Sequence, residues 1–393
     1  MTSYIASSPF SEYLQDLYLE DEGADDALSA AIYAASFATF ALRTRNHKYL
    51  NKGRNKYSLA LSRTNNALKD PKGAVLDRTL ASVLLLGLFE STVFMGKASP
   101  VEWTMHMTGA LRILQLRGLQ QFKSNVAHQL FVHAANNIRT SCIQREMNVH
   151  DELLVLNKSA ILFLGPGDPS NKFSAILDKT ASIRAQIRNS SRLLETNNIG
   201  ILQEVLNLDR EAIGLMNDSE CNLPYTIRSV EDTPSWAYLH TAYRYSSFRI
   251  AKFWNTIRMV RLFLNEIIWN ITSNALGQIR DGITDTTSHP EFDKFTMFLS
   301  LRETSVKNST DIATGVLTCI PDFIEPHPSG RRFSPAARTL AWPLYLLYKC
   351  PLCPQEARVY ARDWLEELAK DLNLPQVVET ANFNLNSGSP DDW

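Results

Sequence analysis

The chain has few of the residues that build disulfide frameworks and no apolar segment of membrane-spanning length. Its 393 residues include only five cysteines, and the longest nearly unbroken apolar run, Leu80–Phe89, is about half of the roughly 20 residues that cross a bilayer. An odd, scattered set of cysteines behind an N-terminus without a secretory signal argues against a disulfide framework. We therefore expect an intracellular, soluble protein.

An excess of charge is absent as well. The chain has 40 basic and 41 acidic residues, a formal net charge of -1. This balance does not indicate binding to nucleic acid or to an anionic membrane. The sequence also has no phosphate-binding glycine loop with lysine, no His-Glu-x-x-His helix and no serine nucleophile elbow. We expect no metal, no cofactor, no direct contact with nucleic acid and no membrane.

Helical periodicity is what the sequence does contain. Apolar residues recur at helical spacing along almost the whole chain, whereas no strict alternation is long enough for a sheet. The expected helices are 25–43, 56–68, 77–90, 175–194, 202–216, 234–276, 292–306, 336–348 and 354–371. The pattern predicts an all-α fold, a single large irregular multi-helix domain over residues 21–383. An acidic, poorly ordered segment (1–20) precedes it, and a disordered tail (384–393) follows.

One stretch carries a resemblance. Asp77–Glu90 reads DRTLASVLLLGLFE, and after a polar loop Trp103–Gly118 reads WTMHMTGALRILQLRG. With further packing patterns at Arg54–Leu61, Trp254–Glu266 and Leu340–Leu344, this order resembles the C-terminal regulatory (middle-homology-type) domain of fungal zinc-cluster transcription factors. The resemblance implies an all-α regulatory domain from a protein that controls fungal metabolism.

The sequence departs from that family at its N-terminus. A binuclear zinc cluster needs six closely spaced thiolates, but the first cysteine here is Cys142. The first 26 residues are acidic, and phosphate would repel them. We expect no zinc-cluster DNA-binding segment in this chain.

Glu90 stands on an apolar helix face. Glu90 follows Val83 and Leu86 at helical spacing, and a buried carboxylate needs a partner such as His106, Arg112 or Arg117. Their commoner role is a structural polar contact between two helices. The alternative is an acid/base or ligand-anchoring group in a cleft, so that Glu90 and His106 are the catalytic candidates if the protein is an enzyme.

Aromatic and basic residues alternate between Pro234 and Trp269. Such residues are more often core aromatics with arginines that reach outward, but they also line small-molecule pockets. The candidate ligand-binding residues of the whole chain are Trp103, His106, Arg117, Tyr243, Trp254 and Arg258.

Two functions fit these observations. The first is a transcription-factor-like regulator of fungal, mainly secondary, metabolism without its own DNA-binding domain. It would act in the nucleus through a small-molecule ligand, a homodimer or another transcription factor. The second is a cytoplasmic, cofactor-independent cyclase, pericyclase or isomerase that reuses the helical scaffold for a metabolite substrate. Fold alone does not decide between them.

Overall fold

The structure is a computed structural model. It describes residues 10, 13–19, 26–93, 101–164, 169–189, 199–217, 225–282, 289–327 and 330–372. Contacts within the chain define two compact units. Unit 1 comprises residues 1–145, 149–171 and 366–393, and unit 2 comprises residues 146–148 and 172–365. The expectation of one domain over 21–383 stays a prediction, and the expected tail 384–393 lies outside the described residues.

Unit 1 consists of helices. They are α1 Leu14–Leu19, α2 Ala27–Thr44, α3 His47–Lys69, α4 Pro71–Ala74, α5 Asp77–Val93, α6 Val101–Arg117, the 3-10 segment η3 Gly118–Phe122, α7 Asn125–Gln144 and α8 Asp151–Leu164. Helix α5, apolar on nearly every face, is buried from Thr79 to Gly87 and contacts α2, α3, α6 and α7. The helix expected over 77–90 is therefore a core helix of unit 1.

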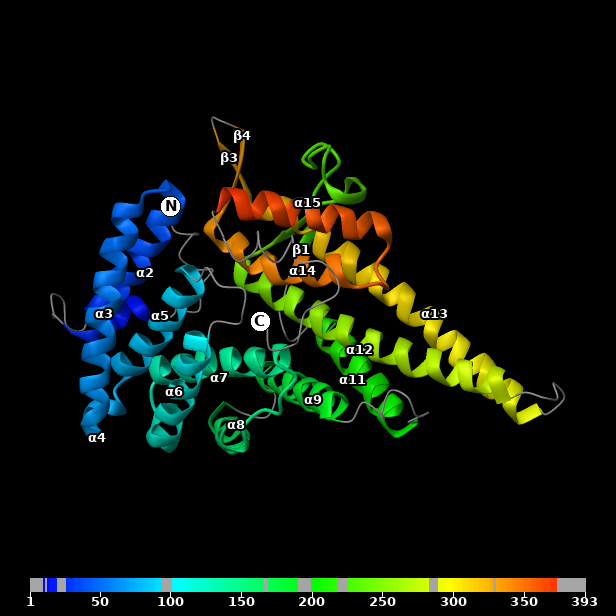
Figure 1. Cartoon of the computed structure of the whole chain (residues 1–393), viewed down its shortest axis with the longest axis horizontal. Coiled ribbons are helices and arrows are strands. Elements are labelled where there is room, and N and C mark those ends of the chain that lie inside the picture. The colour runs from blue at the N-terminus through cyan, green and yellow to red at the C-terminus, as the bar shows by residue number, and fades with distance from the viewer. Residues whose placement is uncertain are drawn as a thin grey trace. The chain divides into compact units, whose positions relative to one another are not determined.

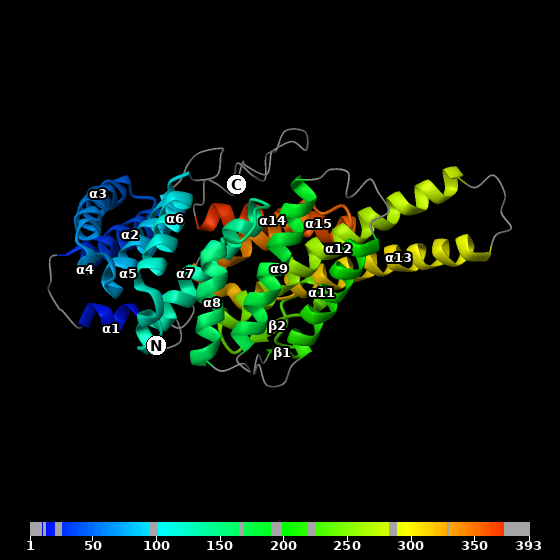
Figure 2. The same cartoon turned by 90° about the horizontal axis from the view of Figure 1, so that it is seen from below.

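Helices α2 and α3 form a tight antiparallel pair and lie side by side in both views (Figures 1 and 2). The Asp26 side chain caps α2 by accepting from the Ser29 N–H, and Arg45, in the left-handed conformation, ends it. Gly53 of α3 permits the close packing, because a Cβ there would lie 3.3 Å from the Ala38 backbone nitrogen. The pair therefore presents one continuous outer surface.

Unit 2 is built on long helices. They are α9 Pro169–Asn189, α11 Ile199–Asn217, α12 Phe248–Gly282, α13 His289–Leu317, α14 Ala341–Lys349 and α15 Gln355–Asp371. The first three residues of α9 and the last six of α15 belong to unit 1. Helices α12 and α13 pack along each other, and α11 packs on α12 (Figure 1).

Short segments connect the helices of unit 2. They are η5 Tyr238–His240, η6 Ile320–Phe323, η7 Pro335–Leu340 and the strands β1 Tyr225–Ile227, β2 Tyr243–Tyr245, β3 Ile324–His327 and β4 Gly330–Phe333. The strands form two antiparallel two-stranded ribbons, β1–β2 and β3–β4. Helices dominate the described residues, so the all-α prediction is confirmed.

One expected helix begins later in the structure. The helix expected over 234–276 begins only at Phe248, because Leu239 and His240 have φ near +50°, which no α-helix contains, and the chain then enters β2. Within the N-terminal segment expected to be poorly ordered, Leu14–Leu19 forms α1, whose Leu17 is buried. Tyr13, just before α1, is also buried, and its hydroxyl contacts His133 Nδ1 at 2.7 Å. The expectation for residues 1–20 as a whole stays a prediction.

Among the described residues, no helix has the length and apolar character that a bilayer crossing requires.

Candidate functional site

A buried arginine lies where α12 meets the β1–β2 ribbon. Arg258 is only 4% exposed. Its Nη1 donates to the Tyr245 hydroxyl at 2.7 Å and to Asn255 Oδ1 at 2.9 Å. Both partners are uncharged groups, and among the described residues no carboxylate forms an ion pair with Arg258. The buried guanidinium therefore has no counter-ion from this part of the chain.

Aromatic rings surround this guanidinium. Its central carbon lies 5.3 Å from the Trp254 ring centroid and 5.8 Å from that of Tyr243, within the range of cation–π attraction. Tyr225 of β1 contacts the Trp254 ring edge-on at 5.1 Å and the Tyr243 ring at 4.9 Å. Tyr225 is 38% exposed, so the aromatic cluster reaches from the buried cation to the surface.

Gly315 of α13 makes room for the guanidinium. A Cβ at this position would lie 2.7 Å from Arg258 Nε and 3.0 Å from its Cζ, closer than real Cβ contacts. Helix α13 thus approaches α12 at a point where only glycine leaves space for the arginine. We define the Arg258 cluster as Tyr225, Tyr243, Tyr245, Trp254, Arg258 and Gly315.

Two titratable groups beside Arg258, the Tyr245 hydroxyl and the Cys319 thiol, stay neutral at physiological pH. Burial raises the pKa of the Tyr245 hydroxyl well above its ordinary value of 10, although Arg258 opposes the shift. Burial also raises the pKa of the Cys319 thiol to about 11. That thiol accepts a hydrogen bond from Asn255 Nδ2 at 3.3 Å. Asp322 is the nearby acid, but it is engaged with Arg228 at 3.0 Å and with the Tyr245 N–H at 3.1 Å.

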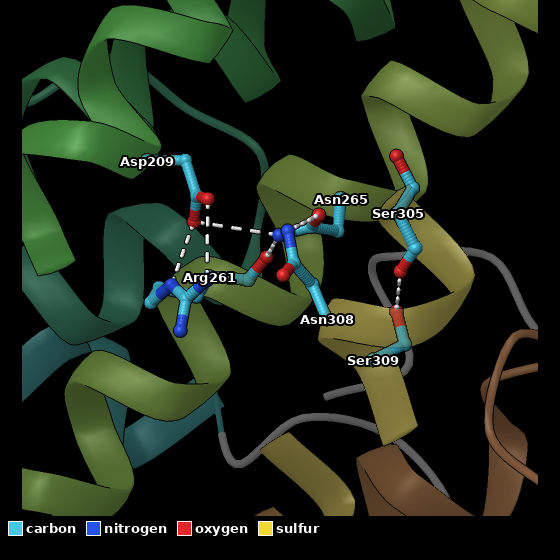
Figure 3. Close-up of polar contacts among 6 residues, drawn as sticks. All are labelled: Asp209, Arg261, Asn265, Ser305, Asn308 and Ser309. Atoms are coloured by element: carbon cyan, nitrogen blue, oxygen red, sulfur yellow. Dashed lines mark hydrogen bonds and ion pairs between the residues drawn. The ribbon is translucent and has the colours of Figure 1, made fainter. Parts of the chain in front are cut away.

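A second polar network holds α11, α12 and α13 together (Figure 3). Both carboxylate oxygens of Asp209 accept from Arg261, at 2.8 and 3.2 Å, and Asn265 Nδ2 adds a contact at 3.3 Å. Asn308 Nδ2 then donates to Asn265 Oδ1 at 2.9 Å. Because both charges and the amides have partners, this network is suited to fixing the three helices rather than to binding a ligand.

Among the described residues, no ion pair joins Glu90 and His106, the two catalytic candidates of unit 1. His106 Nε2 lies 3.3 Å from the hydroxyl of Tyr57, whose ring stacks on Phe89 at 4.6 Å. Glu90 is half-buried and makes no ion pair with His106, Arg112 or Arg117. The contact geometry therefore does not join Glu90 and His106 into an acid/base pair. Their roles, and the enzyme alternative, stay predictions.

The partners expected for Glu90 are engaged elsewhere. Arg117 is buried and forms an ion pair with Asp77 at the start of α5, whereas Arg112 is exposed and lies 3.8 Å from Glu152. Gly109 of α6 does not mark a close helix contact among the described residues, because a Cβ there would meet nothing within 4 Å. Trp103 lies on α6, but its side chain is outside the described part.

The six predicted ligand-binding residues thus fall into two groups. Tyr243, Trp254 and Arg258 meet in the Arg258 cluster of unit 2. Trp103, His106 and Arg117 all lie on α6 of unit 1, where His106 and Arg117 contact different residues. Whether any of the six binds a ligand stays a prediction. The sequence did not indicate Tyr225 or Gly315, since both reach the cluster from distant segments.

The Cys350–Cys353 pair lies beside a buried acid. Cys350 ends α14, and both thiols are buried. The adjacent Cys353 thiol, burial and Glu266 all raise the pKa of Cys350, so the thiolate that redox chemistry or metal binding requires is disfavoured. In the described part of the chain, no group of three or more histidine, cysteine or acidic residues is arranged to hold a metal. The absence of a cofactor stays a prediction.

The raised pKa of Glu266 predicts that stability depends on pH. Burial raises its pKa above the ordinary 4.5, so the folded chain holds this proton more tightly than the unfolded chain does. Its stabilising contribution is present at acid pH and is lost as the pH rises above about 4.5 through the folded-state pKa. From about pH 4.5 to pH 7, the Tm of the wild type should therefore fall relative to that of Glu266→Gln. Glu303→Gln, at an exposed site of α13, controls for the lost charge, and parallel Tm curves for wild type and Glu266→Gln would contradict the shift.

Comparison with known proteins finds a family match for the N-terminal part of the chain. Residues 1–136 match the family model of the fungal specific transcription factor domain. The resemblance seen at Asp77–Glu90 and Trp103–Gly118 is thereby confirmed over about one third of the chain, and the match supports a transcription-factor-like regulatory role. No curated protein and no solved structure matches the chain.

Proposed function

We propose that this chain is a transcription-factor-like regulator of fungal secondary metabolism that senses a small anionic aromatic molecule at the Arg258 cluster. It acts in the nucleus through a protein partner, a second copy or another transcription factor, and does not read DNA itself. The matched family domain supports the regulatory part of the proposal. The ligand and the protein partner go beyond what that match supports and are part of the proposal.

The observation that carries the proposal is the buried charge of Arg258. A guanidinium has five N–H donors, and two hydrogen bonds to Tyr245 and Asn255 leave others available. Removing a cation from water is unfavourable unless an opposite charge compensates it. A ligand carboxylate supplies that charge and pairs with the planar guanidinium through charge-assisted hydrogen bonds.

The surrounding rings define the rest of the ligand. The Tyr243 ring lies 5.8 Å from Arg258, and the Tyr225 ring, which contacts Tyr243, is partly exposed. An aromatic ring attached to the carboxylate can stack there at favourable centroid separations of roughly 4.5–7 Å. The ligand class is therefore a small aromatic carboxylate.

Action through a partner is favoured by the composition. The five cysteines of this chain are one fewer than a six-thiolate cluster needs, and the net charge is -1. Neither feature favours direct binding of the chain to a DNA backbone.

Thermal denaturation with simple carboxylates tests the ligand. A panel of benzoate, phenylacetate and indole-3-carboxylate should raise the Tm of the full chain, whereas neutral benzamide should not. A hundredfold excess over Kd corresponds to about 2.7 kcal/mol of stabilisation. Arg258→Met should abolish the response.

A second arginine beside a tryptophan provides the matched control. Arg302 lies 5.9 Å from the Trp269 ring centroid, so Arg302→Met removes a similar pair outside the Arg258 cluster and should keep the response. A panel without effect on the wild type, or an equal response in Arg258→Met, would refute sensing at this cluster.

A further inference from the structure

The charges of unit 1 are unevenly distributed along the chain. Residues 27–69, which include the α2–α3 pair, contain eight lysines and arginines and no acidic residue. The rest of the chain has 32 basic and 41 acidic residues. The overall balance therefore hides one strongly basic helical pair.

Aromatic residues lie on the outer surface of the same pair. Four rings contact one another in series, with centroids 6.4 Å apart for Tyr33–Phe37, 6.2 Å for Phe37–Tyr49 and 4.8 Å for Tyr49–Phe40. Tyr33 is 46% exposed and Phe40 is 48% exposed. Exposed rings this close together form an apolar surface strip of the kind that marks interaction sites.

Lysines border the strip. Lys56 Nζ lies 5.5 Å from the Tyr33 ring centroid, and Lys52 Nζ lies 5.5 Å from that of Tyr49. We define the aromatic–lysine face as Tyr33, Phe37, Phe40, Tyr49, Lys48, Lys52 and Lys56. Lys48, exposed one turn before Lys52, extends the row, so three ammonium groups follow one side of α3 at four-residue spacing.

We propose that the aromatic–lysine face is the docking surface for an acidic helical segment of a partner protein that carries aromatic or large apolar side chains among its carboxylates. The row from Lys48 to Lys56 spans roughly 12 Å of helix, and carboxylates at four-residue spacing on a partner helix match it in sign and repeat. The exposed rings supply the apolar contact. This proposal is independent of the ligand proposed at Arg258.

Charge favours a peptide over nucleic acid here. A single strand could stack its bases on the rings, but its phosphates need a basic groove that continues along the strand. The basic row is only three lysines long, and the remainder of the chain has nine more acidic than basic residues. A short acidic segment can pair with the three lysines and does not extend to the acidic remainder of the chain.

Fluorescence anisotropy with the full chain tests the proposal. The probe is a labelled synthetic helical peptide of about 17 residues with glutamates at four-residue spacing and Phe and Leu beside them. The triple variant Lys48→Glu, Lys52→Glu, Lys56→Glu should weaken binding at least tenfold. Tyr33→Ala with Phe40→Ala should weaken it without a change in charge. Binding should also weaken as salt rises, because Lys48 and Lys52 are exposed and Lys56 is only half-buried, so salt screens their charges.

A matched control distinguishes the effect of this face from that of a change in net charge. Lys72, Lys123 and Lys158 are exposed lysines of unit 1 outside the face, so their triple change to glutamate alters the net charge equally. It should leave peptide affinity within about twofold. A peptide with alanine in place of Phe and Leu should bind at least tenfold more weakly.

Three results would overturn the proposal. They are equal weakening by the two lysine triples, no loss in the tyrosine–phenylalanine double variant, and tighter binding of a thymidine oligonucleotide than of the peptide. Circular dichroism and Tm establish that each variant is folded. If the glutamate triple does not fold, the glutamine triple at the same three lysines replaces it, with the same tenfold criterion.

Discussion

Replacing Asp209 by alanine is expected to destabilise unit 2 by roughly 3–5 kcal/mol, because it leaves Arg261 without its partner. The two side chains are only 9% and 12% exposed, and two hydrogen bonds join them. The amide of Asn265 loses an acceptor in the same substitution. Chemical denaturation of the purified chain, monitored by tryptophan fluorescence, measures the loss.

The same helix offers a control for this prediction. Glu211, two residues after Asp209 on α11, pairs with Lys179 at 2.8 Å, but both side chains are 48% exposed. An exposed pair of this kind contributes about 0–1 kcal/mol, so Glu211→Ala should have a small effect that salt reduces further. Equal losses in the two variants would mean that Asp209–Arg261 is not the buried connection that we describe (Figure 3).

Gly315→Ala should also destabilise unit 2, by roughly 1–3 kcal/mol. The new Cβ would lie 2.7 Å from Arg258 Nε, so the guanidinium must move away from the Tyr245 hydroxyl and Asn255. Alanine favours a helix over glycine by up to about 1 kcal/mol, which offsets part of the loss. The free energy of unfolding from denaturant titration gives the net value.

Two further variants make this result specific. Gly277→Ala in α12 meets nothing within 4 Å and should stabilise the chain by up to about 1 kcal/mol. In an Arg258→Met background, Gly315→Ala should cost less than in the wild type, because the clashing group is gone. An additive double-mutant cycle would contradict the close packing of Arg258 on Gly315.

Much of the fold could be predicted because it follows from local periodicity. The apolar faces of α5 predict a buried helix, and the spacing of Trp254 and Arg258 places both on one side of α12. The predicted start of α12 at residue 234 was wrong, because no local sequence signal indicates the left-handed backbone of Leu239 and His240. The β1–β2 ribbon depends on pairing across residues 228–242, which helical periodicity does not encode.

The candidate site could be predicted only in part, for the same reason. Tyr243, Trp254 and Arg258 lie within one short stretch, whereas Tyr225 and Gly315 arrive from other elements through tertiary packing. In unit 1, the hydroxyl beside His106 belongs to Tyr57 of α3, which no pattern around Glu90 indicates. Net charge hid the basic α2–α3 pair, because an average over the whole chain removes local asymmetry.

Transcript profiles of fungal strains test the central claim most directly. We compare a deletion strain and an Arg258→Met strain with the wild type, at matched protein levels. If the chain is a regulator that senses its ligand through Arg258, both strains should show the same altered set of transcripts, and a strain with Arg302→Met alone should keep the wild-type profile. Unchanged transcripts in the deletion strain, together with accumulation of one unprocessed metabolite, would contradict the regulator and favour an enzyme.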